Sequence, residues 1–192
     1  MRGTDKYGHT DDRTVPMRLS EFTGPVLEWK QTGRSGGHFE LLGGGQALAT
    51  LDWPRALGGG PASGRFDDRA FSFKRSGFID RKIKVTSAPF DQEVLTADLG
   101  SRDQRILFAD GSAYTISRVS WTDRNWQVVD ANGAPMAMIT VRHGLMRTDG
   151  DVNVVAERQR DPHLPMLIVL GWLIIVLRSR DSAAAAGAAA AT

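Results

Sequence analysis

The 192-residue chain contains no cysteine. This absence excludes disulfide bonds, thiolate metal sites, a cysteine nucleophile and thiol redox chemistry. The chain also lacks a strong excess of one charge, because 24 lysines and arginines face 22 aspartates and glutamates. We therefore expect no nucleic-acid partner. No apolar segment follows the charged residues of the N-terminus, so we expect no secretory signal peptide and a cytoplasmic location, with or without membrane association.

Catalytic and metal-binding motifs are missing as well. The acidic pairs Asp11-Asp12 and Asp67-Asp68 are adjacent residues, and adjacent side chains on a strand point to opposite faces. The four histidines are scattered without the spacing of a metal site: His9, His38, His143 and His163. We therefore predict a non-enzymatic protein without a cofactor or a metal ion.

What the chain does contain is a long series of short β-type segments between residues 15 and 158. They are rich in β-branched and aromatic residues and are separated by Gly, Asp, Asn and Pro, with a spacing of about twelve residues that is typical of an all-β barrel or sandwich. The predicted strands are Val15–Phe22, Val26–Gln31, Phe39–Leu42, Ala47–Trp53, Arg65–Lys74, Arg81–Thr86, Glu93–Leu99, Arg105–Ala109, Ser112–Trp121, Trp126–Asp130, Pro135–Arg142 and Val152–Arg158.

Turn dipeptides and alternation add local detail. Asp110-Gly111 and Asn132-Gly133 each separate two apolar segments, and both favour the type I′ turn of a hairpin. Asp149-Gly150 is a third predicted turn. In the segment 135–142, alternation places Met136 and Met138 on one face and the residues between and after them on the other.

The longest apolar segment, Leu164–Leu177, predicts a helix that is hydrophobic on all sides. Fourteen helical residues span about 21 Å, whereas the hydrocarbon core of a bilayer is about 30 Å thick. This length favours burial in protein. A transmembrane helix near 164–177, with arginines that extend its reach at both ends, is the alternative.

About twelve antiparallel strands can close into a barrel wide enough to hold a helix. We therefore predict a mainly β fold, an antiparallel closed barrel of about twelve strands that encloses a C-terminal hydrophobic helix. The predicted organisation is a flexible arm at 1–14, one barrel domain at 15–180 with its helix at about 163–180, and an Ala-rich disordered tail at 181–192. The helix residues expected in the core are Met166, Leu167, Leu170, Trp172, Leu173, Ile174 and Leu177.

This order of elements resembles the tubby-like barrel group, which includes tubby C-terminal domains, LURP-one-related proteins and phospholipid scramblases. The resemblance covers about Val15 to Arg180 and depends on the strand series and on the helix Met166–Leu177. It implies that the closing helix runs through the barrel. Tubby domains bind phosphoinositides through basic residues on the barrel wall, but no such residue is matched here one by one.

The densest charge lies between Arg65 and Thr86. Within it, the segment 74–84 predicts two strand ends around a turn, with Phe78 and Ile79 near the tip. Cations beside exposed apolar residues suit a site for anionic lipid head groups. The simpler interpretation is an outer barrel face kept soluble by charge, with Lys82 and Lys84 alternating with buried residues. The candidate lipid-binding residues are Lys74, Arg75, Arg81, Lys82 and Lys84.

Two functional hypotheses follow from the sequence. The first is a barrel that binds an anionic phospholipid, such as a phosphoinositide, or a protein partner on its outer face. The second is a tail-anchored membrane protein with a cytoplasmic β domain. A third hypothesis, an enzyme with its site in the barrel mouth, has no group of residues to support it.

Overall fold

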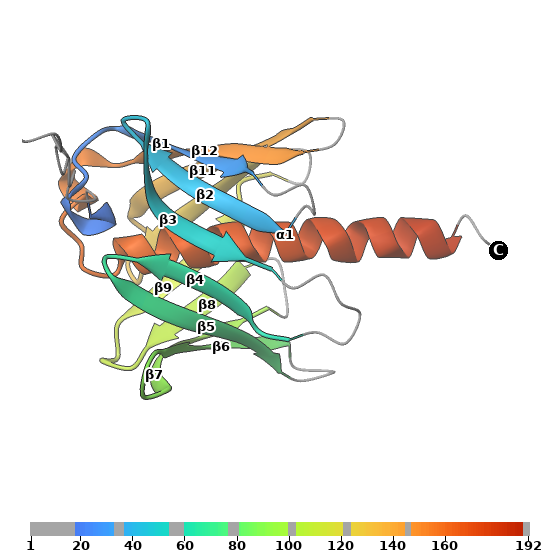
Figure 1. The fold of residues 1–192 in the computed structure, drawn as a ribbon, viewed down its shortest axis with the longest axis horizontal. Helices are drawn as coiled ribbons and strands as arrows, with labels where there is room; N and C mark the ends of the chain where they lie inside the picture. Colours follow the sequence, from blue (N-terminus) through green and yellow to red (C-terminus); the bar gives the residue numbers. More distant parts are fainter. Residues whose placement is uncertain are drawn as a thin grey trace, which may run out of the picture.

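The protein is a closed antiparallel β-barrel around one long helix, as the ribbon drawing shows (Figure 1). The computed structural model describes residues 18–32, 37–53, 60–76, 81–99, 103–120, 124–144 and 147–189. The strands are β1 (Val26–Gln31), β2 (His38–Gly43), β3 (Gln46–Asp52), β4 (Ala62–Phe66), β5 (Arg69–Ser76), β6 (Lys82–Ser87), β7 (Gln92–Asp98), β8 (Asp103–Phe108), β9 (Ala113–Arg118), β10 (Asn125–Asp130), β11 (Pro135–His143) and β12 (Thr148–Val154). Two short 3₁₀ helices, η1 (Leu19–Glu21) and η2 (Ala156–Arg158), precede β1 and follow β12, and α1 (Leu164–Ala189) ends the described chain.

Each strand pairs with its neighbours in the sequence, and β1 pairs with β12 to close the wall. In this closing pair Leu27 lies opposite Val152. Closure leaves no open sheet edge in the barrel. The predicted fold, a mainly β closed barrel of twelve antiparallel strands with one C-terminal helix, is therefore confirmed.

The helix α1 fills the barrel. All fourteen residues from Leu164 to Leu177 are buried, on every side of the helix. Trp172 is fully buried and stacks on Trp29 of β1, with ring centroids 5.6 Å apart. The helix residues that we expected in the core are all among the buried residues: Met166, Leu167, Leu170, Trp172, Leu173, Ile174 and Leu177. The wall supplies the apolar surroundings that an all-apolar helix requires.

The helix extends further than the sequence predicted. It continues past Arg180, where we expected it to end, and the Ala-rich residues remain helical as far as Ala189. Alanine has the highest helix propensity, and no proline interrupts the segment. Among the described helices, none combines the length and the apolar character that crossing a membrane requires.

Two of the predicted strands are wrong. The segment Arg65–Lys74, predicted as one strand, is divided by a turn at Asp67 and Asp68 into β4 and β5. Both aspartates have positive φ, which their short polar side chains tolerate better than most residues do. Within Val15–Phe22, the described residues form the 3₁₀ helix η1 instead of a strand. The number of strands nevertheless matches the expected number because one was gained and one was lost.

Two further local predictions are wrong. Asp149-Gly150 is part of β12, not a turn, and Gly150 lies opposite Val141 of β11. In β11, a shift of register next to Val128 puts Met136 and Ala137 in the interior together. A β-bulge of this kind adds one residue to a strand and breaks simple alternation. Hairpins form at Asp110-Gly111 and Asn132-Gly133 as predicted, but their turns are not of type I′. Gly111 and Gly133 have positive φ, whereas Asp110 and Asn132 do not, and a type I′ turn requires positive φ at both central residues.

The barrel has two different ends. At the turn end, tight connections such as Gly44-Gly45 join the strands, and α1 begins there. At the mouth, α1 leaves the barrel and continues beyond the wall (Figure 1). The two ends present different side chains to solvent.

Candidate functional site

The five cations predicted to bind lipid belong to one hairpin but point in two directions. Strands β5 and β6 pair antiparallel, with Ser76 opposite Lys82 at the mouth. The predicted tip residues Phe78 and Ile79 lie outside the described residues. Ile83 and Val85 are buried, so Lys82 and Lys84 lie on the outer face, as the alternation predicted.

Three lysines form the outer part of the group. Lys74 lies directly opposite Lys84 across the β5–β6 pair. Like charges in this relation destabilise a sheet. The ammonium group of Lys84 contacts the Glu93 carboxylate of β7 at 2.6 Å, which offsets part of this repulsion. The outer lysines, which we call the wall lysines, are Lys74, Lys82 and Lys84.

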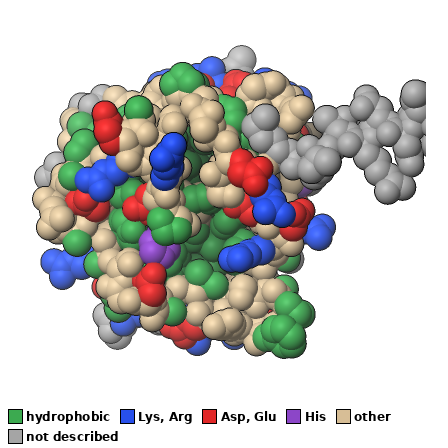
Figure 2. Space-filling model, turned by 90° about the vertical axis from the view of Figure 1, so that its left-hand side faces the viewer, with side chains coloured by type: hydrophobic (Ala, Val, Ile, Leu, Met, Phe, Trp, Pro, Cys, Tyr) green, Lys and Arg blue, Asp and Glu red, His purple; other side chains and the backbone are tan. Residues whose placement is uncertain are grey.

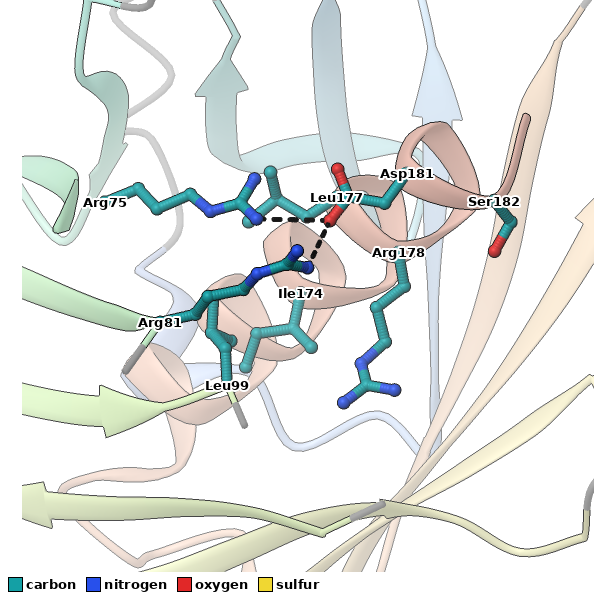
Figure 3. A pocket seen from close by; sticks show the side chains of 8 residues that line it. All are labelled: Arg75, Arg81, Leu99, Ile174, Leu177, Arg178, Asp181 and Ser182. Atoms are coloured by element: carbon teal, nitrogen blue, oxygen red, sulfur yellow. Dashed lines mark hydrogen bonds and ion pairs between the residues drawn. The ribbon is translucent and has the colours of Figure 1, made fainter. Parts of the chain in front are cut away.

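The two arginines of the hairpin point toward the helix instead. Arg75 continues the inward alternation of Phe71 and Phe73 beyond the end of the core, and Arg81 precedes β6. Both guanidinium groups contact Oδ2 of Asp181 on α1, Arg75 at 3.2 Å and Arg81 at 3.4 Å (Figure 3). The carbonyl oxygen of Arg81 also accepts a hydrogen bond from the backbone N–H of Leu99, which fixes the backbone there.

More arginines surround the place where the helix leaves the barrel. Arg178 and Arg118 both lie about 6 Å from the ring centre of Trp126, at 5.8 and 5.9 Å. Partial burial lowers the pKa of Arg178, and the positive charges of Arg118 and Arg81 lower it further. The nearby carboxylate of Asp181 acts in the opposite direction. Arginine keeps its charge in proteins, so Arg178 adds a partly buried positive charge to this end of the barrel.

These groups surround a cavity of about 290 Å³. Charged groups line its rim, and Leu99, Ile174 and Leu177 form its apolar floor. We call this cavity the basic mouth. Its charged lining residues are Arg75, Arg81, Arg178 and Asp181.

Sequence reasoning found only half of the basic mouth. It selected Arg75 and Arg81 from the charge density of their hairpin. It noted Arg178 only as a charge that flanks the helix, and it placed Asp181 in a tail. Because Arg75 and Asp181 are 106 positions apart, only the path of α1 through the barrel brings them together. No local signal in the sequence marks such a pair.

The turn end has a second hollow, in which aromatic and other apolar side chains lie beside a few charged ones, among them Arg69 and Asp110. Figure 2 shows hydrophobic side chains gathered in the middle of this face, with a histidine among them. A cavity of about 670 Å³ lies here, lined by Phe66, Phe71, Phe108 and Met166 among others. Phe90, in the β6–β7 turn, also borders it and is 88% exposed.

His163 fastens the start of α1 at this end. Its ring contacts the Tyr114 hydroxyl at 2.9 Å through Nδ1 and the Asp110 carboxylate at 3.0 Å through Nε2. Burial and the nearby charge of Asp161 raise the pKa of Tyr114 to about 12. Hydrogen bonds from Ser112 lower the pKa of Asp110. These contacts join the helix start to the β8–β9 turn, and we assign them a structural role.

Within the part of the chain that the structure describes, no group of three or more His, Asp or Glu side chains is placed to hold a metal ion. No protein-family model and no curated protein matches the chain. Among solved structures, the chain is similar to an Arabidopsis thaliana protein determined by X-ray crystallography. The TM-score is 0.48 with 12% sequence identity, and the match covers 81% of this chain and 96% of that one.

Proposed function

We propose that the protein is a non-enzymatic barrel of the tubby-like kind that binds anionic phospholipid surfaces through the mouth end of its β5–β6 hairpin. One observation carries this proposal: the cations of the hairpin and those of the emerging helix gather at the same end of the barrel. Arg75, Arg81 and Arg178 line the same cavity there. The wall lysines lie on the outer face of the same β5–β6 pair.

The charges of this end favour an anionic surface. A cation near an anionic membrane contributes about 1 kcal/mol, so five of them supply a useful affinity even without a deep pocket. Lys74 and Lys84 also repel each other across the β5–β6 pair, and a bound anion would relieve that repulsion. Arg75 and Arg81 share one carboxylate, that of Asp181, and Lys84 pairs with Glu93, so these three cations outnumber the two carboxylates that they contact.

The fold supports the tubby-like part of the proposal. Twelve antiparallel strands that close around a C-terminal helix are the arrangement that the resemblance implies. The basic residues of the present chain lie on and beside the barrel wall, where tubby domains carry theirs. Two separate observations therefore support the proposal: the arrangement of the barrel and helix, and the group of basic residues at the mouth.

Vesicle co-sedimentation tests the proposed function. The full chain should bind vesicles of phosphatidylcholine mixed with phosphatidylserine, should bind pure phosphatidylcholine vesicles weakly, and should lose binding as salt increases. A variant with Gln at all five hairpin cations should bind at least about a hundredfold more weakly, since each lost charge costs about 1 kcal/mol near the surface. The substituted residues are Lys74, Arg75, Arg81, Lys82 and Lys84.

A control variant removes the same charge from other exposed positions. It should keep most of the binding. The substituted residues are Lys30, Arg65, Arg69, Arg105 and Arg160. Equal losses in the two variants, or equal binding to neutral and anionic vesicles, would contradict the proposal.

The tail-anchored alternative predicts a different result. If the segment 164–177 were in a bilayer, the protein would stay with the membrane fraction through alkaline carbonate extraction. A protein held by surface charge is released by this treatment. Retention would therefore contradict the proposal and favour the alternative.

A further inference from the structure

Asp181 occupies the centre of the basic mouth in the manner of a bound anion. Asp181 carries the only carboxylate among the described residues that line this cavity. Three arginines line the same cavity. Figure 3 shows the guanidinium groups of Arg75 and Arg81 converging on the Asp181 carboxylate, with the Arg178 side chain extending below them in the view. The helix therefore places one of its own acidic groups where two strands direct their cations.

The fit between this carboxylate and the arginines is incomplete. Both arginines contact the same oxygen, Oδ2, at 3.2 and 3.4 Å. Charge-assisted hydrogen bonds of good geometry measure about 2.7–2.9 Å. Each guanidinium carries five N–H donors, so a single carboxylate oxygen uses only a small part of what the two arginines offer. Asp181 is also about half exposed, with 46% of its side chain accessible, so it can move aside.

From this geometry we infer that the basic mouth is a binding site for a phosphomonoester group, and that Asp181 holds the site closed until such a group displaces it. The inference deepens the proposed function and depends on it only where the phosphate belongs to a lipid.

Charge and shape favour a phosphomonoester over other anions. Its terminal phosphate carries a charge of about −1.5 to −2 and three acceptor oxygens. When Asp181 is displaced, three arginines face the ligand, and a group with a charge near −2 neutralises more of this positive charge than a singly charged anion does. One arginine can donate two parallel hydrogen bonds to a phosphate group. The three terminal oxygens of a phosphomonoester can therefore accept such pairs of hydrogen bonds from two guanidinium groups at once. A phosphodiester has a single charge and two free oxygens, and it serves the site less well.

The volume of the cavity, about 290 Å³, is large enough for a phosphate group and a few attached atoms. The apolar side chains of Leu99, Ile174 and Leu177, which also line the cavity, provide no hydrogen-bond partner for a larger polar group. Two sources can supply such a phosphate, a lipid head group and a free phosphate ester. The experiment separates them.

The full chain is tested against two vesicle types of matched surface charge, one with phosphatidic acid and one with phosphatidylserine in phosphatidylcholine, and against soluble glycerol 3-phosphate by calorimetry. Wild-type protein should bind the phosphomonoester in preference to the phosphodiester. Asp181→Asn should bind the phosphomonoester about fivefold more tightly, because two exposed ion pairs no longer compete. Arg75→Gln combined with Arg81→Gln should bind it at least about tenfold more weakly.

A matched control removes one carboxylate from another exposed arginine. Asp151 contacts Arg142 at 3.2 Å on the β11–β12 side of the barrel. Asp151→Asn changes the net charge by the same amount as Asp181→Asn and should leave phosphomonoester affinity within about twofold of wild type. Equal effects of the two substitutions, or equal affinity for phosphomonoester and phosphodiester, would overturn the inference.

The vesicle and glycerol 3-phosphate measurements also distinguish a failure of this inference from a failure of the proposed function. Binding to both anionic vesicle types that Asp181→Asn leaves unchanged would leave the proposed function standing and overturn the inference. Binding of glycerol 3-phosphate that responds to Asp181, without binding to vesicles, would support the inference with a free ester as ligand and contradict the proposed function. Binding to neither ligand would overturn both.

Discussion

Gly150 is a position where the barrel wall has no room for a side chain. A Cβ placed there would lie 2.5 Å from Cζ3 of Trp172 and 3.0 Å from the carbonyl oxygen of Thr140. The glycine lets the large indole of the central helix lie against the strand. In the sequence, Asp-Gly indicates a turn, and only the presence of Trp172 across the interior explains why this glycine is in a strand.

Gly150→Ala should therefore destabilise the protein by about 1–3 kcal/mol, the usual cost of overpacking a core. The free energy of unfolding in urea measures the effect. In the Trp172→Phe background the shorter ring should reduce the penalty, so the two substitutions should be non-additive. Gly144→Ala, where a Cβ would meet only ordinary contact at 3.5 Å, is the control. A penalty that is the same in both backgrounds would contradict the contact with Trp172.

His38 makes the stability of the barrel depend on pH. At the mouth, its Nδ1 contacts Asp52 and its Nε2 lies 3.4 Å from Glu40. The hydrogen bond to Asp52 is the main cause that raises the pKa of His38 above its usual value, against a smaller opposing effect of burial. A raised pKa in the folded state means that the stabilisation is fully present below the unfolded pKa of about 6.5 and is lost as pH rises through the folded pKa.

We therefore expect wild-type protein to be more stable than His38→Gln at about pH 6 and this difference to shrink above the folded pKa. Its size should stay below about 1 kcal/mol because solvent screens the ion pair, in which 35% of the His38 side chain and 54% of the Asp52 side chain are exposed. Urea unfolding at a series of pH values measures it. Asp52→Asn should show the same loss of pH dependence. A difference that does not change with pH would show that the pair does not act through the charge of His38.

At the scale of elements, the helix and the wall stabilise each other. The wall surrounds the fourteen buried residues of α1, and these residues form one hydrophobic cluster with the inward side chains of the wall. Burial of each Leu or Ile side chain contributes about 1.5–3 kcal/mol. Removal of the helix should therefore leave the strands without a folded core.

Deletion of residues 164–192 should give insoluble or molten protein, whereas deletion of 183–192 should leave the unfolding midpoint unchanged. Near-ultraviolet circular dichroism and size-exclusion chromatography report the difference. As a test without truncation, Leu170→Asp should cost at least about 3 kcal/mol because it buries an unpaired charge. Leu107→Asp is the matched control, since Leu107 lies on the outer wall and is 53% exposed. A folded and stable Leu170→Asp protein would contradict the central position of the helix.

The observed strands also show where the local sequence pattern gave a wrong prediction. The twelve strands were predicted from apolar segments and turn residues, and ten of them overlap single observed strands. The error at Asp67-Asp68 arose because neither residue is a glycine, although both adopt positive φ. The error at Met136 arose because a bulge depends on the register with β10, which no single strand reveals.

At the scale of the whole molecule, the distribution of charge matters more than its sum. The formal net charge of +2 excludes little about an anionic ligand, because three arginines line a single cavity at the mouth. The basic mouth takes its charged residues from β5, from the residue before β6 and from α1. These elements meet only because a twelve-strand barrel has a bore wide enough for the helix to pass through.

The sequence by itself determined the fold class, because alternation, turn chemistry and helix length are local properties, and an all-apolar helix of about 21 Å together with about twelve strands leaves few arrangements that bury both. It also marked Arg75 and Arg81 as candidates through their local charge density. Only the tertiary structure decided that these two arginines face inward and that Asp181 meets them. Such a contact joins residues about a hundred positions apart, and the closure of the wall around the helix sets it, which is a property of the whole barrel.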